Sequence, residues 1–406
     1  MRIVIIGAGA AGLMTASVIC EHNPKTEIFL IEKNDQVGKK ILLTGGGRCN
    51  LTTGLTDIDE ILKKYPRGSR FLSYAMHEFP PKKICEFFEN HGLPLKIEKD
   101  LRVFPKSEKA QDVINVFQKI LYSPNVKILL ETKVLQVIKK REKFEICLDD
   151  NEKIIADKIV LTCGGESLNS NINGYDIAKS FGHSIKQLRP SLTSFIVKEK
   201  FIKNLAGIAF ETVSLTIKAK RDFTFSGSIL FTHQGLSGPA IFAISALVAY
   251  EEFCLKNPLI LLIDLRPEIS FEALLEFFKQ KSISDDKKKF VNILSALLPK
   301  NLAMILGDNL KINLEKKFNE ISKKELNQIV ENIKNFKLTL IGRNLESQMV
   351  TAGGVNLREI DKQTMQSKIC SDLYFAGEIL DIDGFTGGFN LQAAWATGMT
   401  VGRSIK

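Results

Sequence analysis

The chain has 406 residues, of which 44% are hydrophobic and 25% are charged, and it contains 28 glycines. This length allows two or three domains with sizeable cores, and the composition excludes a largely disordered chain. The formal net charge of +10 allows attraction to phosphate-rich partners such as RNA, but a lysine-rich proteome explains it equally well, because the charge is spread along the chain.

A predicted strand–helix–strand unit begins the chain. The short β-branched run Arg2–Ile6 predicts a buried strand, Ala10–Cys20 predicts a helix, and Ile28–Ile31 predicts a second strand that ends at Glu32. The glycines of this apolar stretch serve a turn better than a signal peptide or a membrane span, and a second apolar stretch, Pro239–Tyr250, is too short to cross a bilayer. We therefore expect a soluble protein with no membrane partner.

The elements that follow keep an α/β pattern up to about residue 187. In chain order they are a glycine-rich connection at 38–54, helices at 80–92 and 110–121, a β-meander at 127–139 and 143–148, and a strand at 158–162. A different pattern then begins, with expected strands at 195–198, 212–218 and 228–232, lysine-rich helices over 268–335, and a strand at 337–341. Glycine is dense again from residue 350, so the order predicts β-rich and helical insertions inside an α/β domain.

The seven cysteines show no spacing typical of a metal site or of a CxxC pair. They are Cys20, Cys49, Cys85, Cys147, Cys163, Cys254 and Cys370, and the five histidines do not pair with them either. We expect neither a disulfide framework nor a bound metal, which suits a reducing cytoplasm.

The first motif is GAGAAG at residues 7–12, placed between the first strand and the first helix. Gly7 permits a tight turn, Gly9 lets the backbone approach a pyrophosphate, and Gly12 allows the helix to pack closely on the strand. Glu32 stands where a carboxylate accepts hydrogen bonds from a ribose diol. The motif predicts dinucleotide binding.

Two further glycine-rich motifs point to the same kind of ligand. The first, at residues 38–50, contains three consecutive glycines and Arg48, which would neutralise phosphate or contact a flavin ring, although a plain loop is the alternative. The second runs from Gly377-Glu378 through residues 381–390 into a helix at 391–402, whose first amides could bind an anion or a polarised carbonyl.

Together the strings GAGAAG, GKKILLTGGGRCN, LTCGG, FTHQGLSGPA, VTAGGV and YFAGEILDIDGFTGGFNLQ resemble the YhiN/BaiN-like family of FAD flavoproteins, in family order along nearly the whole chain. The resemblance implies an α/β fold, with a Rossmann-like FAD-binding domain built from both chain ends, an inserted β-barrel and a small helical subdomain. Family members are commonly labelled NAD(P)/FAD-dependent or aminoacetone-oxidase-like oxidoreductases. Some reduce a carbon–carbon double bond conjugated to a carbonyl, in steroid-like enones or in uracil of RNA.

We accordingly expect an FAD domain at 1–187 and 350–406, a β-rich domain at 188–267 and 336–349, and a helical subdomain at 268–335. The resemblance implies that the residues contacting FAD are Gly7, Gly9, Ala10, Ala11, Gly12, Glu32, Lys33, Lys40, Thr44, Gly46, Arg48, Cys49, Asn50, Thr162, Gly164, Gly165, Thr351, Gly353, Gly354, Gly377, Glu378, Asp381, Gly387, Gly388 and Asn390. Near residues 169–175 family members often read Asp-Gly-Tyr, whereas this chain has Asn173, which puts in doubt any role there that needs an anion.

A reductase of a conjugated double bond needs a hydride from the flavin and a proton for the α-carbon. Cys49 is the first candidate for the proton donor, because neighbouring Arg48 would lower the pKa of its thiol, but it is equally well a small packing residue. His233 is second and Tyr175 third, and the histidine has a structural role as its alternative.

Several functions remain open at this point. The leading hypothesis is an FAD-dependent reductase acting on ribosomal RNA or a small enone, with NADH or NADPH as a transient reductant, since a second complete GxGxxG unit is absent. An amine oxidase is the other enzyme hypothesis. A non-catalytic flavoprotein that binds a partner through residues 268–335 is the third. The sequence leaves the oligomeric state open.

Overall fold

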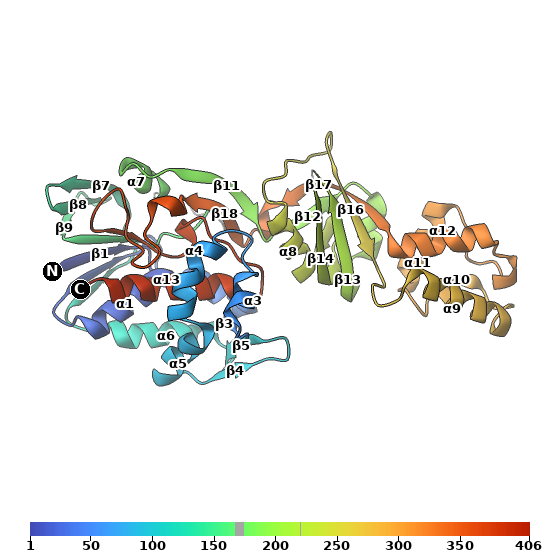
Figure 1. The fold of residues 1–406 in the computed structure, drawn as a ribbon, viewed down its shortest axis with the longest axis horizontal. Helices are drawn as coiled ribbons and strands as arrows, with labels where there is room; N and C mark the ends of the chain where they lie inside the picture. Colours follow the sequence, from blue (N-terminus) through green and yellow to red (C-terminus); the bar gives the residue numbers. More distant parts are fainter. Residues whose placement is uncertain (167–173, 220) are drawn as a thin grey trace. The chain divides into compact units, whose positions relative to one another are not determined.

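The computed structural model describes residues 1–166, 174–219 and 221–406. The chain divides into two compact units, one formed by Met1–Pro190 with Val350–Lys406 and the other by Ser191–Met349 (Figure 1). Neither unit has, among the described residues, a helix with the length and apolar character needed to cross a bilayer.

The first unit is built on a five-stranded parallel sheet with the strand order β19-β10-β1-β2-β6. Its strands are β1 (Arg2–Ile6), β2 (Glu27–Ile31), β6 (Val126–Leu129), β10 (Lys158–Leu161) and β19 (Leu373–Phe375). In the middle of the sheet Ile5 pairs with Val160 on one side and Leu30 on the other, and all three are fully buried. A strand buried on both faces reads as a continuous apolar run, which is why these segments could be predicted.

Two helices from opposite ends of the chain pack against each other in this unit, α1 (Ala10–His22) and α13 (Phe389–Ser404). Small residues allow the close approach, since a Cβ at Gly398 would lie 2.7 Å from the Ala11 carbonyl oxygen and one at Gly402 would lie 2.6 Å from Val18. Trp395 is fully buried and donates its indole N–H to the Leu51 carbonyl at 2.9 Å. The N-terminal and C-terminal segments therefore form one core.

Smaller elements surround this core. They are the helices α2 (Lys39–Leu43), α3 (Ile58–Leu62), α4 (Ser69–Glu78), α5 (Pro81–Asn90), α6 (Ala110–Leu121) and α7 (Gly174–Ser180), the sheet of β3 (Thr52–Thr53), β5 (Arg102–Pro105) and β4 (Leu95–Ile97), the sheet of β7 (Val134–Lys140), β8 (Lys143–Leu148) and β9 (Lys153–Ala156), and the pair β11 (Ile185–Ser191) and β18 (Val350–Val355).

The second unit contains a closed six-stranded barrel in the order β12-β15-β14-β13-β16-β17. Its elements are β12 (Ser194–Val197), β13 (Ala209–Lys218), β14 (Asp222–Phe231), β15 (Gly235–Ser237), the helix α8 (Pro239–Leu247), β16 (Leu259–Asp264) and β17 (Phe336–Asn344). Closure leaves no free sheet edge, and inward-facing residues such as Leu215, Leu261 and Leu338 are fully buried.

Between β16 and β17 the chain forms the helices α9 (Phe271–Ser284), α10 (Phe290–Leu294), α11 (Lys300–Leu310) and α12 (Lys323–Lys334). Their core is aromatic, with the rings of Phe290 and Phe318 stacked at 5.1 Å and Phe278 against both. Ser322 and Glu325 form a capping box that begins α12. Figure 1 shows these helices gathered beyond the barrel strands, within one unit of the chain.

The predicted fold class is confirmed: a Rossmann-like unit from both chain ends, a closed barrel and a helical part. One local prediction was wrong, and two helices were not predicted. The expected meander strand at 127–139 is two strands, because β6 pairs with β2 in the parallel sheet and only β7 joins the meander. The glycine-rich connection contains the short helix α2, and α4 was not anticipated, since its sequence mixes apolar and polar residues without strong helix signals.

Candidate functional site

The GAGAAG motif forms the turn between β1 and α1, at the carboxyl ends of the parallel strands. Gly7 has φ of +104°, a conformation that favours glycine, and its carbonyl accepts a hydrogen bond from Thr162 Oγ1 at 2.7 Å. A Cβ at Gly12 would lie 1.9 Å from the Gly7 carbonyl oxygen and 2.7 Å from Thr162 Oγ1. Gly7 and Gly12 are therefore required by the packing of the protein itself.

Gly9 differs from its two neighbours. Its backbone is extended, with φ of −79°, and an added Cβ would meet no atom of the described residues within 4 Å. It precedes the first turn of α1, which contains no acidic residue and whose amides at Ala10 and Ala11 form the positive end of the helix dipole. Protein packing does not explain a glycine here, whereas close approach of an anion to the backbone does.

Glu32 follows the last residue of β2 and is buried. Its carboxylate accepts from the Ala8 amide at 2.8 Å and from the Asn34 side chain, so it is fixed beside the glycine turn. This is the position at which dinucleotide folds place an acid against a ribose diol. The next residue, Lys33, has an exposed side chain.

The loop at residues 38–50 is tied to the C-terminal part of the chain. Lys40 Nζ lies 2.6 Å from Glu378 Oε2, and Glu378 Oε1 accepts from the Thr351 amide at 2.9 Å. A Cβ at Gly165 would lie 2.6 Å from Thr351 Oγ1 and 2.8 Å from Glu378 Oε1. Four segments that are distant in the sequence therefore meet at Glu378.

The remaining glycines of this region have a positive φ, and three of them also lie against other protein atoms. Gly164 has φ of +78°, and Gly353 and Gly354 lie against backbone carbonyls of β11 and of residues 379–380. Gly377 lies against Ala11 at the start of α1, where an added Cβ would be 2.8 Å from the alanine Cβ. Gly46 also has a positive φ, +68°, but is exposed, and Thr44 beside it bonds the Ile41 carbonyl at 2.7 Å.

The loop at 381–390 enters α13 through Gly387 and Gly388, which have φ of +123° and +89°. The Asn390 side chain closes the loop by hydrogen bonds to the Gly384 amide and carbonyl, both at 2.8 Å. Asn50, in its hydrogen-bonding orientation, accepts from the Gly388 amide at 3.0 Å. The amides that open α13 are thus held by residues from both ends of the chain.

Residues 65–68, which were not identified from the sequence, bind the loop at 381–390. Arg67 forms a two-pronged ion pair with the fully buried Asp383, and the Tyr65 hydroxyl donates to the Phe389 carbonyl at 2.7 Å. Gly68, with φ of +78°, lies against residues 381–382. Asp383 was visible as a charge within a glycine-rich loop, but nothing in the sequence pairs it with Arg67, 316 residues away.

Arg48 makes contacts within its own neighbourhood. Its guanidinium forms ion pairs with Glu98 at 3.0 Å and Glu108 at 3.6 Å and lies 4.1 Å from the centre of the Phe104 ring. These contacts account for the charge of Arg48 without phosphate or flavin.

The expectation for Cys49 was wrong in its physical reason. The residue is fully buried, and burial raises the pKa of its thiol to about 12, where a lowered pKa was expected from Arg48. Cys49 has φ of +60° and a side chain enclosed by protein, which fits a packing role.

The other two proton-donor candidates lie in different units. His233 is exposed in the turn between β14 and β15 of the second unit. Tyr175 lies on α7 of the first unit and is buried, and burial together with the charge of Glu378 raises the pKa of its hydroxyl far above the ordinary value. The departure at Asn173 lies outside the described residues.

Three buried polar atoms of this region have no hydrogen-bond partner within the described parts of the chain: Tyr175 OH, Thr351 Oγ1 and Asp381 Oδ1. Burial also raises the pKa of the Asp381 carboxyl. Unpartnered buried polar groups are rare in proteins and point to a missing ligand. Together with the open space at Gly9, they fit a dinucleotide whose polar groups complete these bonds.

Known proteins resemble this chain over nearly its whole length. A family model described as the HI0933-like protein Rossmann domain matches residues 1–404. The chain is 29% identical to the 3-dehydro-bile acid delta(4,6)-reductase of Clostridium scindens, with 99% of this chain and 98% of that protein covered. It is 32% identical to a ribosomal RNA dihydrouridine synthase of Haemophilus influenzae, again with 99% and 98% covered.

Solved structures share the fold at low identity. The 3-ketosteroid delta1-dehydrogenase from Sterolibacterium denitrificans matches with a TM-score of 0.51 and 12% identity, over 99% of this chain and 98% of that one. The E. coli quinol fumarate reductase matches with a TM-score of 0.51 and 15% identity, over 99% and 69%. The family match and the relatives confirm the resemblance found in the sequence: this chain belongs to the HI0933-like family of FAD-dependent Rossmann oxidoreductases.

Proposed function

We propose that this protein is a reductase that saturates a carbon–carbon double bond conjugated to a carbonyl, and that its substrate is uracil in ribosomal RNA. The observation that carries the proposal is the approach of the α1 N-terminus to residues 377–378, where Gly377 lies against Ala11 and Glu378 pairs with Lys40. Two named relatives, a bile acid reductase and a ribosomal RNA dihydrouridine synthase, support it because both substrates contain the same conjugated pattern.

Each part of the site would have a separate task. When bound, FAD would supply the hydride. The α1 amides that follow Gly9 would hold the pyrophosphate, and Glu32 would hold the ribose. Lys40 and Glu378 would line the middle of the cofactor. The first backbone amides of α13, which follow Gly388, would stabilise negative charge at the other end.

Tyr175 is the proton donor that we propose. Its hydroxyl stays protonated at neutral pH, because burial and the charge of Glu378 raise its pKa, and it makes no hydrogen bond within the described residues that would hold the proton elsewhere. The φ of +60° and the enclosed side chain of Cys49 fit a packing role, and the His233 side chain is exposed, whereas Tyr175 has an unpartnered buried hydroxyl within the described residues. Tyr175 thus has the most support among the three candidates.

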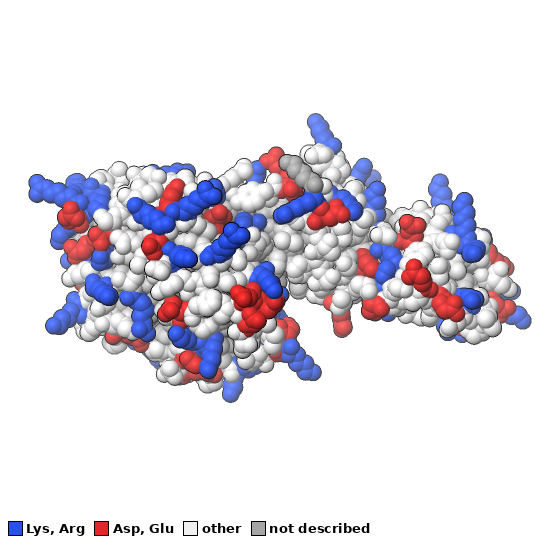
Figure 2. All heavy atoms as spheres, viewed as in Figure 1, with Lys and Arg blue, Asp and Glu red and all other residues white. Residues whose placement is uncertain are grey.

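The charge of the chain is compatible with RNA without requiring it. On the face drawn in Figure 2, lysine and arginine side chains are interspersed with acidic ones and form no continuous block. Within the helical part several lysines are paired, for example Lys281 and Lys288 with Asp285 and Lys289 with Glu315. Residues 268–335 therefore offer little support for a broad nucleic-acid surface.

The test begins with the FAD-loaded protein under anaerobic conditions, mixed with NADH or NADPH while flavin bleaching is followed. The reduced protein is then mixed with ribosomal RNA from a strain that lacks this protein, or with a panel of enones. Reoxidation by RNA with dihydrouridine gained at one position supports the proposal, and we propose that this reaction takes place in the cytoplasm. Rapid peroxide formation with amines, without bleaching by either nicotinamide, would refute it in favour of an oxidase.

A small enone is the second candidate substrate, favoured by the bile acid reductase among the relatives. Reoxidation by enones and not by RNA would select it. A Tyr175→Phe variant is the control for both substrates, since loss of turnover with normal flavin reduction would assign the proton to Tyr175. Full biological function in a protein that cannot hold reducible flavin would instead support a non-catalytic role.

A further inference from the structure

The helix α13 begins with three backbone amides that donate to no atom of the described residues. They belong to Phe389, Asn390 and Leu391, and they form the positive end of the helix dipole. The Gly388 amide before them is already bonded to the Asn50 side chain at 3.0 Å. Because the proposed function places the three amides at the cofactor, the position of this first turn decides how well they meet it.

The loop that leads into α13 lies against residues 64–68. The Phe385 amide donates to the Lys64 carbonyl at 2.9 Å. Further along, Arg67 and Asp383 face each other in an isolated antiparallel bridge. One short segment of the chain therefore holds this loop at several points.

The ion pair of Arg67 with Asp383 fixes a direction as well as a charge. The Nε of Arg67 donates to Oδ1 of the carboxylate and Nη2 donates to Oδ2. Asp383 is fully buried, and the Arg67 side chain is 16% exposed. A planar guanidinium with two parallel bonds sets the orientation of its partner, whereas a lysine ammonium supplies the same charge from a single point. The arginine thus orients the loop in a way that a lysine cannot.

Tyr65 extends the same contact to the helix itself. Its buried hydroxyl donates to the Phe389 carbonyl at 2.7 Å, and the two rings meet edge to face with their centres 6.1 Å apart. Phe389 is the first residue of α13. The segment therefore holds both the loop and the first turn that carries the three amides.

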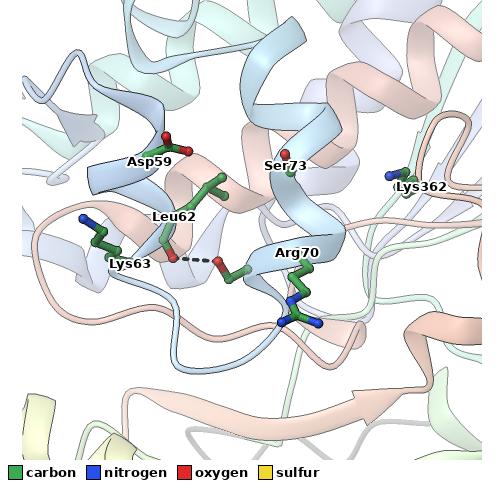
Figure 3. A pocket seen from close by; sticks show the side chains of 7 residues that line it. Asp59, Leu62, Lys63, Arg70, Ser73 and Lys362 are labelled. Carbon is green, nitrogen blue, oxygen red and sulfur yellow. Dashed lines mark hydrogen bonds between the residues drawn. The ribbon is translucent and has the colours of Figure 1, made fainter.

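This segment is itself fixed between two helices, α3 and α4. Ser69, the first residue of α4, donates its hydroxyl to the carbonyl of Leu62, the last residue of α3, at 2.9 Å. Figure 3 shows this bond as a dashed line that joins the two helices. Residues 63–68 are thus a short connection whose ends are tied together.

We propose that Arg67 is a positioning residue of the reductase, whose paired bonds to Asp383 hold the first amides of α13 where they stabilise the negative charge that the cofactor gains on reduction. The inference rests on the proposed function, which places these amides beside FAD. Donors fixed in advance stabilise a developing charge without reorganisation, so a small displacement weakens them. Arg67 thus favours reduction of the cofactor through α13, without contact of its own.

Two variants of the full-length, FAD-loaded protein test this role. Arg67→Lys retains the charge beside Asp383 but lacks the planar fork. Tyr65→Phe removes the hydroxyl bond to Phe389 and changes no charge. A change common to both variants therefore reports the position of the first turn and not a lost charge.

Lys158→Met is the matched control. It breaks a partly buried ion pair with Asp372 in the same unit. Lys158 is the first residue of β10, whereas the glycine turn lies at the carboxyl ends of the parallel strands. The control therefore lowers stability at the other end of the sheet.

The reduction potential of bound FAD is measured by anaerobic equilibration with a reference dye, and the Kd of oxidised FAD by fluorescence quenching. We expect Arg67→Lys and Tyr65→Phe to weaken binding of reduced relative to oxidised FAD about tenfold, which lowers the potential of this two-electron couple by about 30 mV. We expect Lys158→Met to lower the melting temperature and to keep the wild-type potential.

A wild-type potential in Arg67→Lys overturns the proposal and leaves this residue a purely structural role. If Arg67→Lys does not retain FAD, Tyr65→Phe decides in the same way. An equal shift in Lys158→Met also overturns the proposal, since the potential would then follow a general loss of stability. The potential is measured without RNA or enone, so absence of dihydrouridine or enone reduction refutes the proposed function separately.

Discussion

Gly9 and Gly12 provide a matched pair of substitutions that separates a glycine required by the ligand from one required by the protein. Gly9→Ala adds a Cβ that meets no described atom within 4 Å, on a backbone with φ of −79° that alanine adopts freely. Gly12→Ala adds a Cβ 1.9 Å from the Gly7 carbonyl oxygen. The same chemical change therefore has different expected effects three residues apart.

The magnitudes follow from these contacts. At Gly9 alanine is a poorer helix N-cap by about 0.5–1 kcal/mol, which the lower entropy of the unfolded chain offsets by about 0.4–1 kcal/mol, so the net change is small. At Gly12 the overlap is with backbone, which cannot move aside as a flexible side chain does, and we expect a loss of about 3 kcal/mol. That corresponds to a fall in melting temperature of roughly 6–12 °C.

The expected effect of Gly9→Ala on FAD affinity comes from contact with the ligand and not from protein packing. At Gly9 the added methyl group occupies the space through which a pyrophosphate would approach the backbone, so we expect FAD affinity to fall at least about tenfold, or 1.4 kcal/mol. The rise in melting temperature on adding FAD should then shrink in Gly9→Ala while the apo melting temperature stays near the wild-type value.

The assay is differential scanning fluorimetry of apo and FAD-loaded protein, with the FAD Kd from flavin fluorescence quenching. Wild-type FAD affinity in Gly9→Ala would show that no dinucleotide approaches Gly9, and would refute the assignment of this turn as the phosphate cradle. A wild-type melting temperature for Gly12→Ala would refute the packing argument separately.

Three further predictions concern groups around the site. Arg67→Leu should destabilise the protein by about 3–5 kcal/mol, because the fully buried Asp383 charge then lacks its ion-pair partner. Replacing both residues by leucine should destabilise it less. Chemical denaturation measures both losses, and equal losses would contradict the ion-pair argument. Tyr175→Phe should leave the melting temperature nearly unchanged, since its hydroxyl has no partner within the described residues, yet lower turnover by about 10²-fold or more in steady-state assays; unchanged turnover would remove it as proton donor. Burial lowers the pKa of His183, which lies between Glu359 and Ser367, so the unfolded chain binds the proton more tightly. Stability should therefore fall as pH drops below about 6.5. The melting temperature of His183→Gln should depend less on pH in this range, and parallel pH profiles of variant and wild type would contradict the prediction.

The sequence was sufficient to predict the parts of the fold that depend on local pattern. Val4, Ile5 and Leu30 belong to short apolar runs of β-branched and aliphatic residues, and such runs indicate a strand buried on both faces wherever they occur. β6 was assigned to the wrong sheet because the run beginning at Val126 contains Lys127 and alternates like a meander strand. Which sheet an edge strand joins depends on a long-range partner, here β2, that local periodicity does not encode.

The same distinction applies to the side chains of the site. The glycines at 7, 9 and 12 could be assigned from their spacing, because a turn between strand and helix has a local geometry. Arg48 was expected at a ligand because a cation beside three glycines suggests one, but Glu98, which follows β4, and Glu108, which follows β5, form ion pairs with it. Its partners, like the pairing of Arg67 with Asp383, are set by tertiary structure.

The glycines of this region differ in whether an added Cβ would meet protein atoms. Gly377 and Gly398 lie where the first and last segments of the chain touch, since a Cβ would lie 2.8 Å from the Ala11 Cβ at Gly377 and 2.7 Å from the Ala11 carbonyl oxygen at Gly398. These glycines therefore allow α1 and α13 to approach, which brings both helix N-termini to the same side of the sheet. Gly9 alone among the three glycines of its motif is left without a protein neighbour that requires it. The chain ends thus pack together through their backbones, and the open space at Gly9 is where we propose that the pyrophosphate approaches.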